Sequence, residues 1–258
     1  MSKQLRLIYL GDIVGRSGRE ILKTTIPSLK EKYNYDLLIV NAENSAGGRG
    51  ISPKIAEELF TAGVDFMTLG DHIWDEKKII PYLENNSHKI IAPANLAPAE
   101  AGKGYAVIEY DGTKIAICNL LGRVFMNLSS DCPFQKITKL LAHELKEVKV
   151  KILDFHAEAT SEKYAMFRYL TGKMSLIVGT HTHVPTADQQ ISGGTGYVTD
   201  LGMTGSQAHV IGLDSEAAIL RFIGVPKSFK VGVGDQRVSG VYADIHCESG
   251  ECVRIERV

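Results

Sequence analysis

The sequence predicts an α/β fold, and two features of the chain carry that prediction. Short apolar runs alternate with stretches whose apolar residues recur at helical spacing, which is the pattern of strands that alternate with helices. The apolar runs are residues 5–10, 36–40, 65–69, 89–91, 149–155 and 175–178. From about residue 193 the pattern changes to strands and turns, at 217–223, 240–247 and 253–258. We expect these later strands to form antiparallel pairs that complete or cover the sheet.

Two of the intervening helices can be described from the sequence. Ser52 is typical of an N-cap, and Pro53 suits the first helical position because its missing N–H would have no partner there. Ile55, Leu59 and Phe60 then lie on one side of the predicted helix. The stretch 136–148 predicts a second helix, whose apolar face carries Ile137, Leu140, Leu141 and Leu145.

The composition is that of an ordinary globular protein. Of the 258 residues, 44% are apolar and 23% are charged, and we expect one domain over residues 1–258 because no linker or repeat divides the chain. The net charge of -1 argues against a broad surface for duplex nucleic acid or anionic lipid. No stretch has the pattern of a signal peptide or a membrane span. The four scattered cysteines match no zinc ribbon or disulfide framework, so we expect reduced thiols and a cytoplasmic protein.

Polar side chains suited to metal binding follow five of the apolar runs. The carboxyl ends of strands in an open α/β sheet line one crevice, so residues far apart in sequence converge there. Taken alone, each has an ordinary explanation, since an aspartate after a strand is often the next helix's N-cap. On an extended segment the two imidazoles of His181-Thr-His183 would face the same way. The candidates are Asp12, Glu43, Asn44, Asp71, His156, His181 and His183.

The number and type of these seven candidates favour two metal ions. They mix oxygen and nitrogen donors, lack thiolate, and exceed what one tetrahedral zinc requires. Seven ligands suit two ions with one carboxylate that bridges them, the arrangement that clamps the attacking and leaving oxygens during displacement at phosphorus. Iron and manganese fit this donor set, and zinc is also compatible.

Glycine-rich turns offer alternative interpretations. The turn at 11–19 follows a predicted strand, opens a helix, and could cradle a dinucleotide, as in an oxidoreductase. Its spacing is G-x-x-x-G-x-x-G, unlike the dinucleotide fingerprint, and Asp12 would meet the pyrophosphate. The glycines at 46–50 could form a phosphate nest, although a tight turn is their commoner use.

Several longer motifs resemble those of one family. GDIVGRSGR, NAENSAGGRG, GDHIWD, DFHAEATSEK, GTHTHVPTAD and TDLGMTG occur in order between residues 11 and 205. They are similar to the successive motifs of the YmdB-type branch of the calcineurin-like metallophosphoesterases, bacterial phosphodiesterases that act on cyclic nucleotides. The C-terminal RFIGVPKSF and the final strands are also similar, so the resemblance covers nearly the whole chain.

The resemblance implies a four-layered fold, with a β-sandwich flanked by helices, and a binuclear metal centre. Asp12, Asn44 and His183 would then hold one ion, Asp71, His156 and His181 the other, and Glu43 would bridge them. His72 would take the place of the catalytic histidine. The resemblance further implies a small cyclic nucleotide, 2′,3′ or 3′,5′, as the substrate, and allows a homo-oligomer; it assigns no substrate-binding residue.

Two positions depart from the pattern of the wider superfamily. The first motif usually reads D-x-H, whereas here Val14 replaces the histidine and Asn44 compensates. The third usually reads Gly-Asn-His, whereas here Asp71 replaces the asparagine. A carboxylate at 71 should tighten cation binding, but it repels an anionic phosphodiester and cannot donate the amide hydrogen bond. An alternative is therefore a metal-binding regulatory protein of the same fold with weak or no turnover.

The mechanistic hypothesis is phosphodiester hydrolysis. A metal-bridging hydroxide attacks phosphorus in line while the ions neutralise the equatorial oxygens. His72 then assists, either by protonating the leaving oxygen or by binding a phosphoryl oxygen in the transition state.

Overall fold

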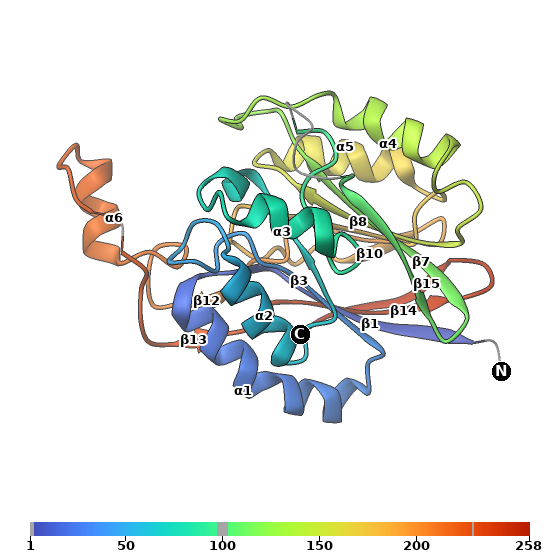
Figure 1. The fold of residues 1–258 in the computed structure, drawn as a ribbon, viewed down its shortest axis with the longest axis horizontal. Coiled ribbons are helices and arrows are strands. Elements are labelled where there is room, and N and C mark those ends of the chain that lie inside the picture. Colours follow the sequence, from blue (N-terminus) through green and yellow to red (C-terminus); the bar gives the residue numbers. More distant parts are fainter. Residues whose placement is uncertain (1–2, 97–102, 229) are drawn as a thin grey trace.

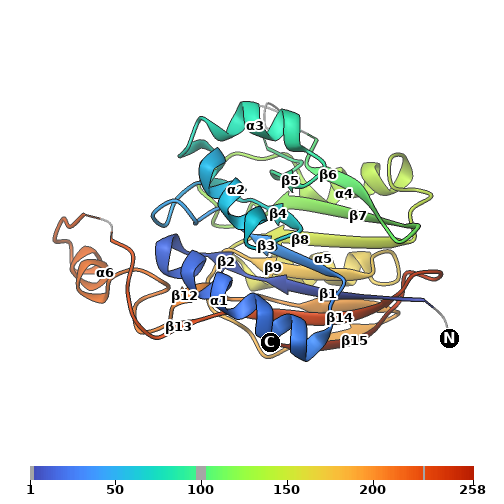
Figure 2. The same cartoon turned by 60° about the horizontal axis from the view of Figure 1, so that its bottom comes forward.

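Two six-stranded sheets pack face to face in this computed structural model, which describes residues 3–96, 103–228 and 230–258 (Figures 1 and 2). The first sheet has the order β15 (Cys252–Arg257), β14 (Gly240–His246), β1 (Gln4–Leu10), β3 (Leu37–Asn41), β4 (Phe66–Thr68) and β5 (Ile90–Ile91). The second has the order β10 (Gln190–Ser192), β11 (Thr195–Val198), β9 (Leu176–Thr180), β8 (Val150–His156), β7 (Thr113–Leu121) and β6 (Tyr105–Tyr110).

A small third sheet lies beside the first. It pairs β2 (Asp12–Ile13) with β12 (Met203–Ser206), which in turn pairs with β13 (Gln236–Arg237). Through this sheet the segment that follows β1 is held against the C-terminal part of the chain.

Helices cover the two outer faces of the sandwich. The first sheet carries α1 (Gly15–Tyr33), α2 (Pro53–Thr61) and α3 (Ile79–Asn86), and the second carries α4 (Pro133–Ala142) and α5 (Thr160–Leu170). The four layers therefore run helices, sheet, sheet, helices, which confirms the fold expected from the resemblance. A further helix, α6 (Ser215–Phe222), projects from the body in both views (Figures 1 and 2).

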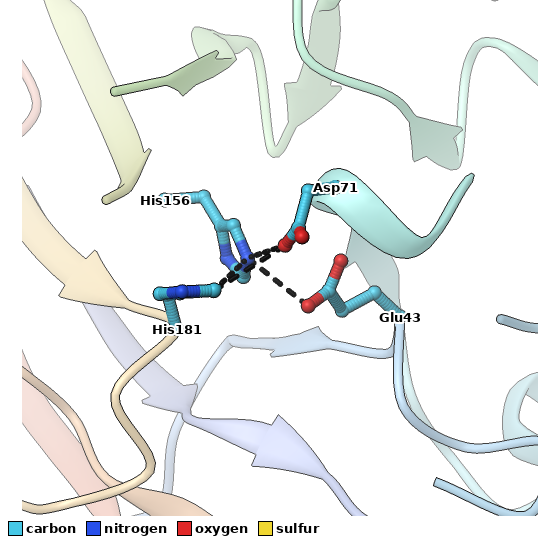
Figure 3. Close-up of side chains that lie close together, drawn as sticks. All are labelled: Glu43, Asp71, His156 and His181. Atoms are coloured by element: carbon cyan, nitrogen blue, oxygen red, sulfur yellow. Dashed lines mark hydrogen bonds and ion pairs between the residues drawn. The ribbon is translucent and has the colours of Figure 1, made fainter. Parts of the chain in front are cut away.

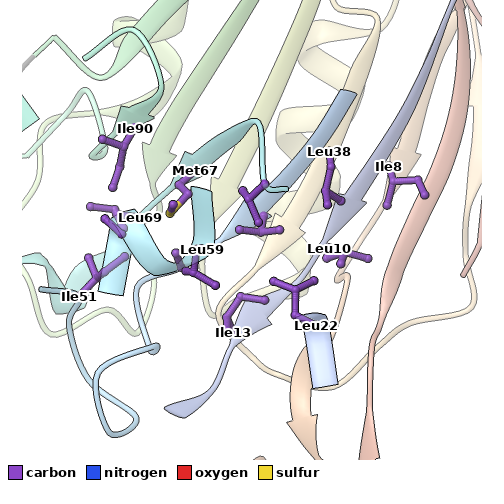
Figure 4. Packing of buried hydrophobic residues seen from close by; sticks show 14 of the residues in the cluster. Ile8, Leu10, Ile13, Leu22, Leu38, Ile51, Leu59, Met67, Leu69 and Ile90 are labelled. Carbon is purple, nitrogen blue, oxygen red and sulfur yellow. The ribbon is translucent and has the colours of Figure 1, made fainter. Parts of the chain in front are cut away.

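The strand β1 shows why its sequence is continuously apolar. Side chains alternate between the two faces of a strand, and both faces of this strand are covered. Ile8 and Leu10 pack toward α1 and its neighbours, in the cluster drawn in Figure 4, while Leu7 and Tyr9 pack against the second sheet. All four side chains are fully buried.

Most predicted elements are confirmed with small shifts of their bounds. The six apolar runs are β1, β3, β4, β5, β8 and β9, and α2 begins as expected, with the Ser52 hydroxyl accepting a hydrogen bond from the Ile55 N–H. The final two predicted strands are β14 and β15, and β14 pairs antiparallel with both β1 and β15. The strands β6 and β7 were not predicted from the sequence. All four cysteines are free thiols, as expected.

Two predictions of secondary structure are wrong. Residues 217–223 lie mostly in the helix α6, because the Asp214 side chain caps it by accepting the Ala217 N–H, and no described strand pairs with this projecting segment. The helix predicted over 136–148 begins earlier and ends at Ala142. A turn follows, in which the Leu145 N–H donates to the Leu140 carbonyl, so Leu145 reaches the core without a helix.

No helix in the described part of the chain is long and apolar enough to cross a membrane.

Candidate metal centre

The polar residues predicted from the strand ends meet where the two sheets converge. In the first sheet β1, β3 and β4 are parallel neighbours, and in the second β8 and β9 are parallel neighbours. Their carboxyl ends face one edge of the sandwich, which is where loops of an open α/β sheet form a crevice. All seven candidate ligands lie at this edge.

Four of them form a tight cluster (Figure 3). Glu43, Asp71, His156 and His181 each offer one donor atom, and these atoms lie within 4.8 Å of one another. The His156 Nε2 atom lies 3.0 Å from Glu43 Oε1 and 3.1 Å from Asp71 Oδ1, and Asp71 Oδ1 lies 3.3 Å from His181 Nδ1. Two carboxylates and two imidazoles thus point into one small volume.

Buried polar groups behind the cluster fix the His156 ring. Its Nδ1 atom lies 2.8 Å from the Thr180 hydroxyl, and that hydroxyl donates to Asp154 Oδ1 at 2.6 Å. The Thr180 hydroxyl hydrogen is therefore bonded to Asp154, so the Thr180 oxygen accepts a hydrogen bond from His156 Nδ1–H. The Nε2 atom of His156 is then left to face the cluster. This is how a second layer of hydrogen bonds orients a metal-binding histidine.

Asp154 in turn is held by hydroxyl and amide donors. Its Oδ2 atom accepts hydrogen bonds from Thr68 at 2.5 Å, Asn41 at 3.1 Å and Tyr9 at 3.1 Å. Because Tyr9 and Thr68 come from the first sheet and Asp154 from the second, this network also joins the two sheets behind the cluster.

The other three candidates lie together beside this cluster. His183 Nε2 is 3.3 Å from Asn44 Oδ1 and 3.9 Å from Asp12 Oδ1, and Asp12 Oδ2 accepts the backbone N–H of His181 at 3.2 Å. Asp12 is fully buried, and its Oδ1 atom has no hydrogen-bond partner among the described residues. Burial and the nearby carboxylates, including Glu43, raise the pKa of Asp12 to about 7.

These observations fit a metal centre. A buried carboxylate oxygen without a hydrogen-bond partner costs free energy unless a cation meets it. Hard oxygen donors combined with imidazole nitrogens suit first-row transition metals. The described residues therefore hold a cluster of metal-ligating type; the assignment of individual ligands to two ions stays a prediction.

Electrostatic interactions within the cluster favour the ionised forms of its carboxylates, which are the forms that bind metal ions. Burial opposes ionisation of Asp71, but hydrogen bonds from His156 and His181 hold the pKa of this carboxyl far below its usual range. Burial likewise opposes protonation of His156, yet the charge of Glu43 and the hydrogen bonds that His156 donates to Asp71 and Glu43 raise its pKa well above the ordinary value. Positive charge at this point is thus strongly stabilised.

The two histidines of the His181-Thr-His183 motif do not lie on an extended segment, contrary to the prediction. The strand β9 ends at Thr180, and His181 and His183 have φ of 100° and 64°, in the left-handed region that non-glycine residues rarely adopt. Their rings consequently reach different neighbours, His156 in one case and Asn44 in the other. Backbone strain of this kind persists only where surrounding structure holds it.

A buried ion pair holds this turn. The Asp200 Oδ2 atom accepts the N–H of Thr182, between the two histidines, at 3.3 Å and a hydrogen bond from Lys163 Nζ at 2.6 Å. The side chains of Lys163 and Asp200 are each only 1% exposed. This pair was not predicted from the sequence, although both residues lie in the motifs that carry the family resemblance.

His72 lies beside the cluster without belonging to it. It sits in the 3-10 helix that follows β4, its backbone N–H donates to Glu43 Oε2 at 3.0 Å, and its side chain is 25% exposed. Its Nδ1 atom lies 2.9 Å from Asp75 Oδ2, so the carboxylate fixes the orientation of the ring. Asp75 belongs to the GDHIWD motif, but no role for it was predicted.

A cavity of about 270 Å³ opens in front of these groups. Its lining includes the three histidines His72, His181 and His183, together with Arg49, Glu158 and Ile211. The Glu158 carboxylate lies 3.2 Å from His181 Nε2, the ring nitrogen that faces away from the cluster. The last three residues were not predicted, because nothing in the local sequence places them at the site.

The structure does not support a dinucleotide cradle in the first glycine turn. The Asp12 carboxylate points toward His183 beside the cluster, and a side chain at Gly18 would overlap the Thr204 carbonyl, so the turn packs closely against β12. In the turn at 46–50, the Gly48 N–H donates to the Asn44 carbonyl and the Ala46 N–H to the Gly50 carbonyl. These bonds agree with the tight-turn interpretation, and the turn also holds Asn44, whose Nδ2 donates to the Gly48 carbonyl at 3.0 Å.

A sequence model of the family described as YmdB-like protein matches residues 8–258. The chain belongs to the YmdB-like family. It is 41% identical over 256 residues to a Bacillus subtilis (strain 168) protein named 2′,3′-cyclic-nucleotide 2′-phosphodiesterase, and the match covers 98% of this chain and 96% of that relative.

Solved structures of relatives have the same fold. A crystal structure of a novel phosphatase from Mycoplasma pneumoniae superposes with a TM-score of 0.93 at 37% identity, covering 100% of this chain and 94% of the other. A hypothetical protein from Thermus thermophilus superposes with a TM-score of 0.89 at 36% identity, covering 98% of each chain. The resemblance drawn from the motifs is thereby confirmed.

Proposed function

We propose that this member of the YmdB-like family hydrolyses 2′,3′-cyclic nucleotides at a two-metal centre. The chain is a phosphoric diester hydrolase, as the names of its relatives indicate. The observation that carries the proposal is the convergence of Glu43, Asp71, His156 and His181, with a histidine outside the cluster facing the same cavity. The choice of a 2′,3′-cyclic substrate rests on the name of the Bacillus subtilis relative.

The proposed metal ligands follow the two groups that the structure brings together. Asp12, Asn44 and His183 would hold one ion, Asp71, His156 and His181 the other, and Glu43, beside both, would bridge. Iron and manganese are the ions we propose, with zinc as a further candidate. When bound, the two ions supply Lewis acidity, which activates water and neutralises charge on the phosphoryl oxygens.

The chain's own residues perform the remaining tasks. Hydrolysis adds water across the P–O2′ bond, so the 2′-oxygen leaves as a hydroxyl and the phosphate stays on the 3′-oxygen. His72 donates the proton that the 2′-oxygen needs, and Asp75 orients its ring for this transfer. The bond from the His72 N–H to Glu43 fixes this acid relative to the metal centre.

The test compares two histidine variants with wild type. His72→Ala should lower kcat about 10²- to 10⁴-fold and keep the metal content, whereas His181→Ala should lose metal. His88→Ala, at an exposed histidine, serves as the control. Turnover of 2′,3′-cyclic AMP, 3′,5′-cyclic AMP and bis(p-nitrophenyl) phosphate is measured with and without Mn²⁺, and metal content by mass spectrometry. Full turnover in His72→Ala together with full metal content in His181→Ala would overturn the assignment of roles.

The carboxylate at position 71 is the observation that favours a second candidate function. This carboxylate adds negative charge where an anionic diester must approach, so a regulatory protein with a metal centre and weak turnover is the alternative. Metal-loaded wild-type protein that hydrolyses none of the three substrates would favour this alternative.

A further inference from the structure

A second cavity adjoins the one in front of the metal centre. It measures about 410 Å³, and the two cavities share three lining residues, Arg49, Ile211 and Leu213. From these residues the second cavity extends to α6, where Arg221 and Phe222 line it. The site therefore continues beyond the metal centre along the projecting helix.

The segment between the cavities is tied to a proposed ligand. The Nδ1 atom of His183 lies 2.9 Å from the Ile211 carbonyl oxygen, so the ring N–H donates to the segment that separates the two cavities. Ile211 itself has a φ of 46°, in the left-handed region, and its side chain is 41% exposed. The boundary between the cavities is thus fixed relative to the metal centre.

The chemistry of the second cavity differs from that of the first. The first includes the acidic side chains Glu43 and Glu158, whereas the described residues that line the second include two arginines and no acidic residue. The Phe222 side chain is 86% exposed, and it lines this cavity together with Arg221. Guanidinium groups and an exposed aromatic ring around one cavity suit a phosphate followed by a base, the repeating unit of a single-stranded nucleic acid.

We propose that the second cavity binds the nucleotide that precedes a terminal 2′,3′-cyclic phosphate, so that the preferred substrate is the 3′ end of a short single-stranded oligoribonucleotide. This inference rests on the proposed function. The geometry of such a substrate agrees with it, because the cyclic phosphate uses the 2′ and 3′ oxygens and the rest of the strand leaves from the 5′ oxygen, away from the reacting phosphorus. Arg49 and Arg221 bind the 5′-phosphate, and Phe222 stacks on the preceding base.

The hydrolytic step stays the one already described. Water adds across the terminal P–O2′ bond, the oligonucleotide keeps a 3′-phosphate and regains its 2′-hydroxyl, and no internucleotide bond is broken. The net charge of -1 agrees with binding of one or two nucleotides and not of a long duplex.

The experiment compares adenosine 2′,3′-cyclic phosphate with the dinucleotide ApA that ends in a 2′,3′-cyclic phosphate. Wild type should hydrolyse the dinucleotide with kcat/KM about tenfold higher, mainly through KM, since stacking of one base and one phosphate contact contribute at this scale. Phe222→Leu should remove most of this advantage and Phe222→Trp should keep it, because both replacements are apolar but only tryptophan stacks. Arg221→Gln should raise KM for the dinucleotide alone, and Arg257→Gln, at an exposed arginine of β15, is the control.

The outcomes separate this inference from the proposed function. Failure of wild type to hydrolyse either substrate would overturn the proposed function, and the inference with it. Hydrolysis of both substrates with equal kcat/KM, or equal effects of Phe222→Leu on both, would overturn the inference alone. The oligomeric state of each variant is measured by light scattering: dissociation in Phe222→Leu with parallel loss on both substrates would assign this surface to self-association and reject the oligonucleotide.

Discussion

Replacement of Asp71 by asparagine tests how far this site depends on its additional carboxylate. The change keeps the shape of the side chain and one oxygen donor but removes a negative charge. The charge lies 3.1 Å from His156 Nε2 and 3.3 Å from His181 Nδ1, atoms that also face the proposed ion. A unit charge at about 3 Å interacts with another by about 5 kcal/mol at an effective dielectric constant of about 20.

Two effects make the expected loss of metal-binding free energy smaller than this interaction energy. The amide oxygen can still bind the ion. The side chain is buried by more than four-fifths, and a neutral amide there does not carry the desolvation cost of a buried carboxylate. We therefore expect Asp71→Asn to weaken metal retention about 10- to 100-fold, the scale typical of perturbed ligand surroundings. At saturating metal it should raise kcat/KM for a phosphodiester, because less negative charge opposes the substrate.

The assay titrates metal out with a chelator and measures bis(p-nitrophenyl) phosphate turnover at saturating Mn²⁺. Asp235→Asn, which removes a carboxylate from an exposed ion pair with Arg237, is the matched control. If Asp71→Asn retained metal as wild type does and lost turnover, the carboxylate would be needed for chemistry and the electrostatic reasoning would be refuted.

Three further predictions concern the support of the site and the core. Gly70→Ala should abolish metal retention in protein that still folds, because a Cβ there would overlap the His156 ring; retention measured by mass spectrometry would contradict this. Lys163→Met should lower the free energy of unfolding by about 3–5 kcal/mol, since it leaves the Asp200 charge buried alone. The double substitution Lys163→Met/Asp200→Leu should recover most of that loss in urea unfolding, and an equal loss would argue against the charge as its cause. Burial raises the pKa of the Cys118 thiol to about 12 from an ordinary value of 9.0, so the unfolded chain loses this proton first. Stability should consequently fall as pH rises above about 9, by up to about 1.4 kcal/mol per pH unit from this group, and Cys118→Ala should show a shallower fall.

The α/β class and the strand ends could be predicted well because both depend on local patterns, whereas the four-layered arrangement was expected only from the family resemblance. Continuous apolar runs such as the one in β1 mark strands that are covered on both faces, and polar residues placed directly after them mark the crevice. The resemblance of the motifs added a proposed catalytic histidine and a proposed grouping of the ligands, which spacing alone left open; both stay predictions. The single domain, the cytoplasmic location and any homo-oligomer stay predictions.

The features that were not predicted depend on tertiary contacts. Residues 217–223 are apolar enough for a strand, but a strand requires a neighbouring strand to pair with. The Asp214 side chain caps the segment instead, and this favours a helix. The strained turn at His181 and His183 follows from the hydrogen bond between Thr182 and Asp200, residues 18 apart in the chain. Asp75, Glu158 and Arg49 contact or face the site only because the loops fold toward it.

The proposed metal centre lies between two sheets that each contribute part of its candidate ligands. Glu43 and Asp71 follow strands of the first sheet and Asp12 lies in β2 of the small sheet beside it, whereas His156 and His181 come from the second sheet and the loop after β9. Neither sheet alone carries a complete set of donors for either proposed ion, so binding strength depends on how the sheets dock. Ions that bind only the docked form stabilise it by mass action. If the proposed ions bind, metal supply would set the resistance of the folded chain to unfolding as well as its catalytic capacity, and a substitution that shifts one sheet against the other would reduce both at once.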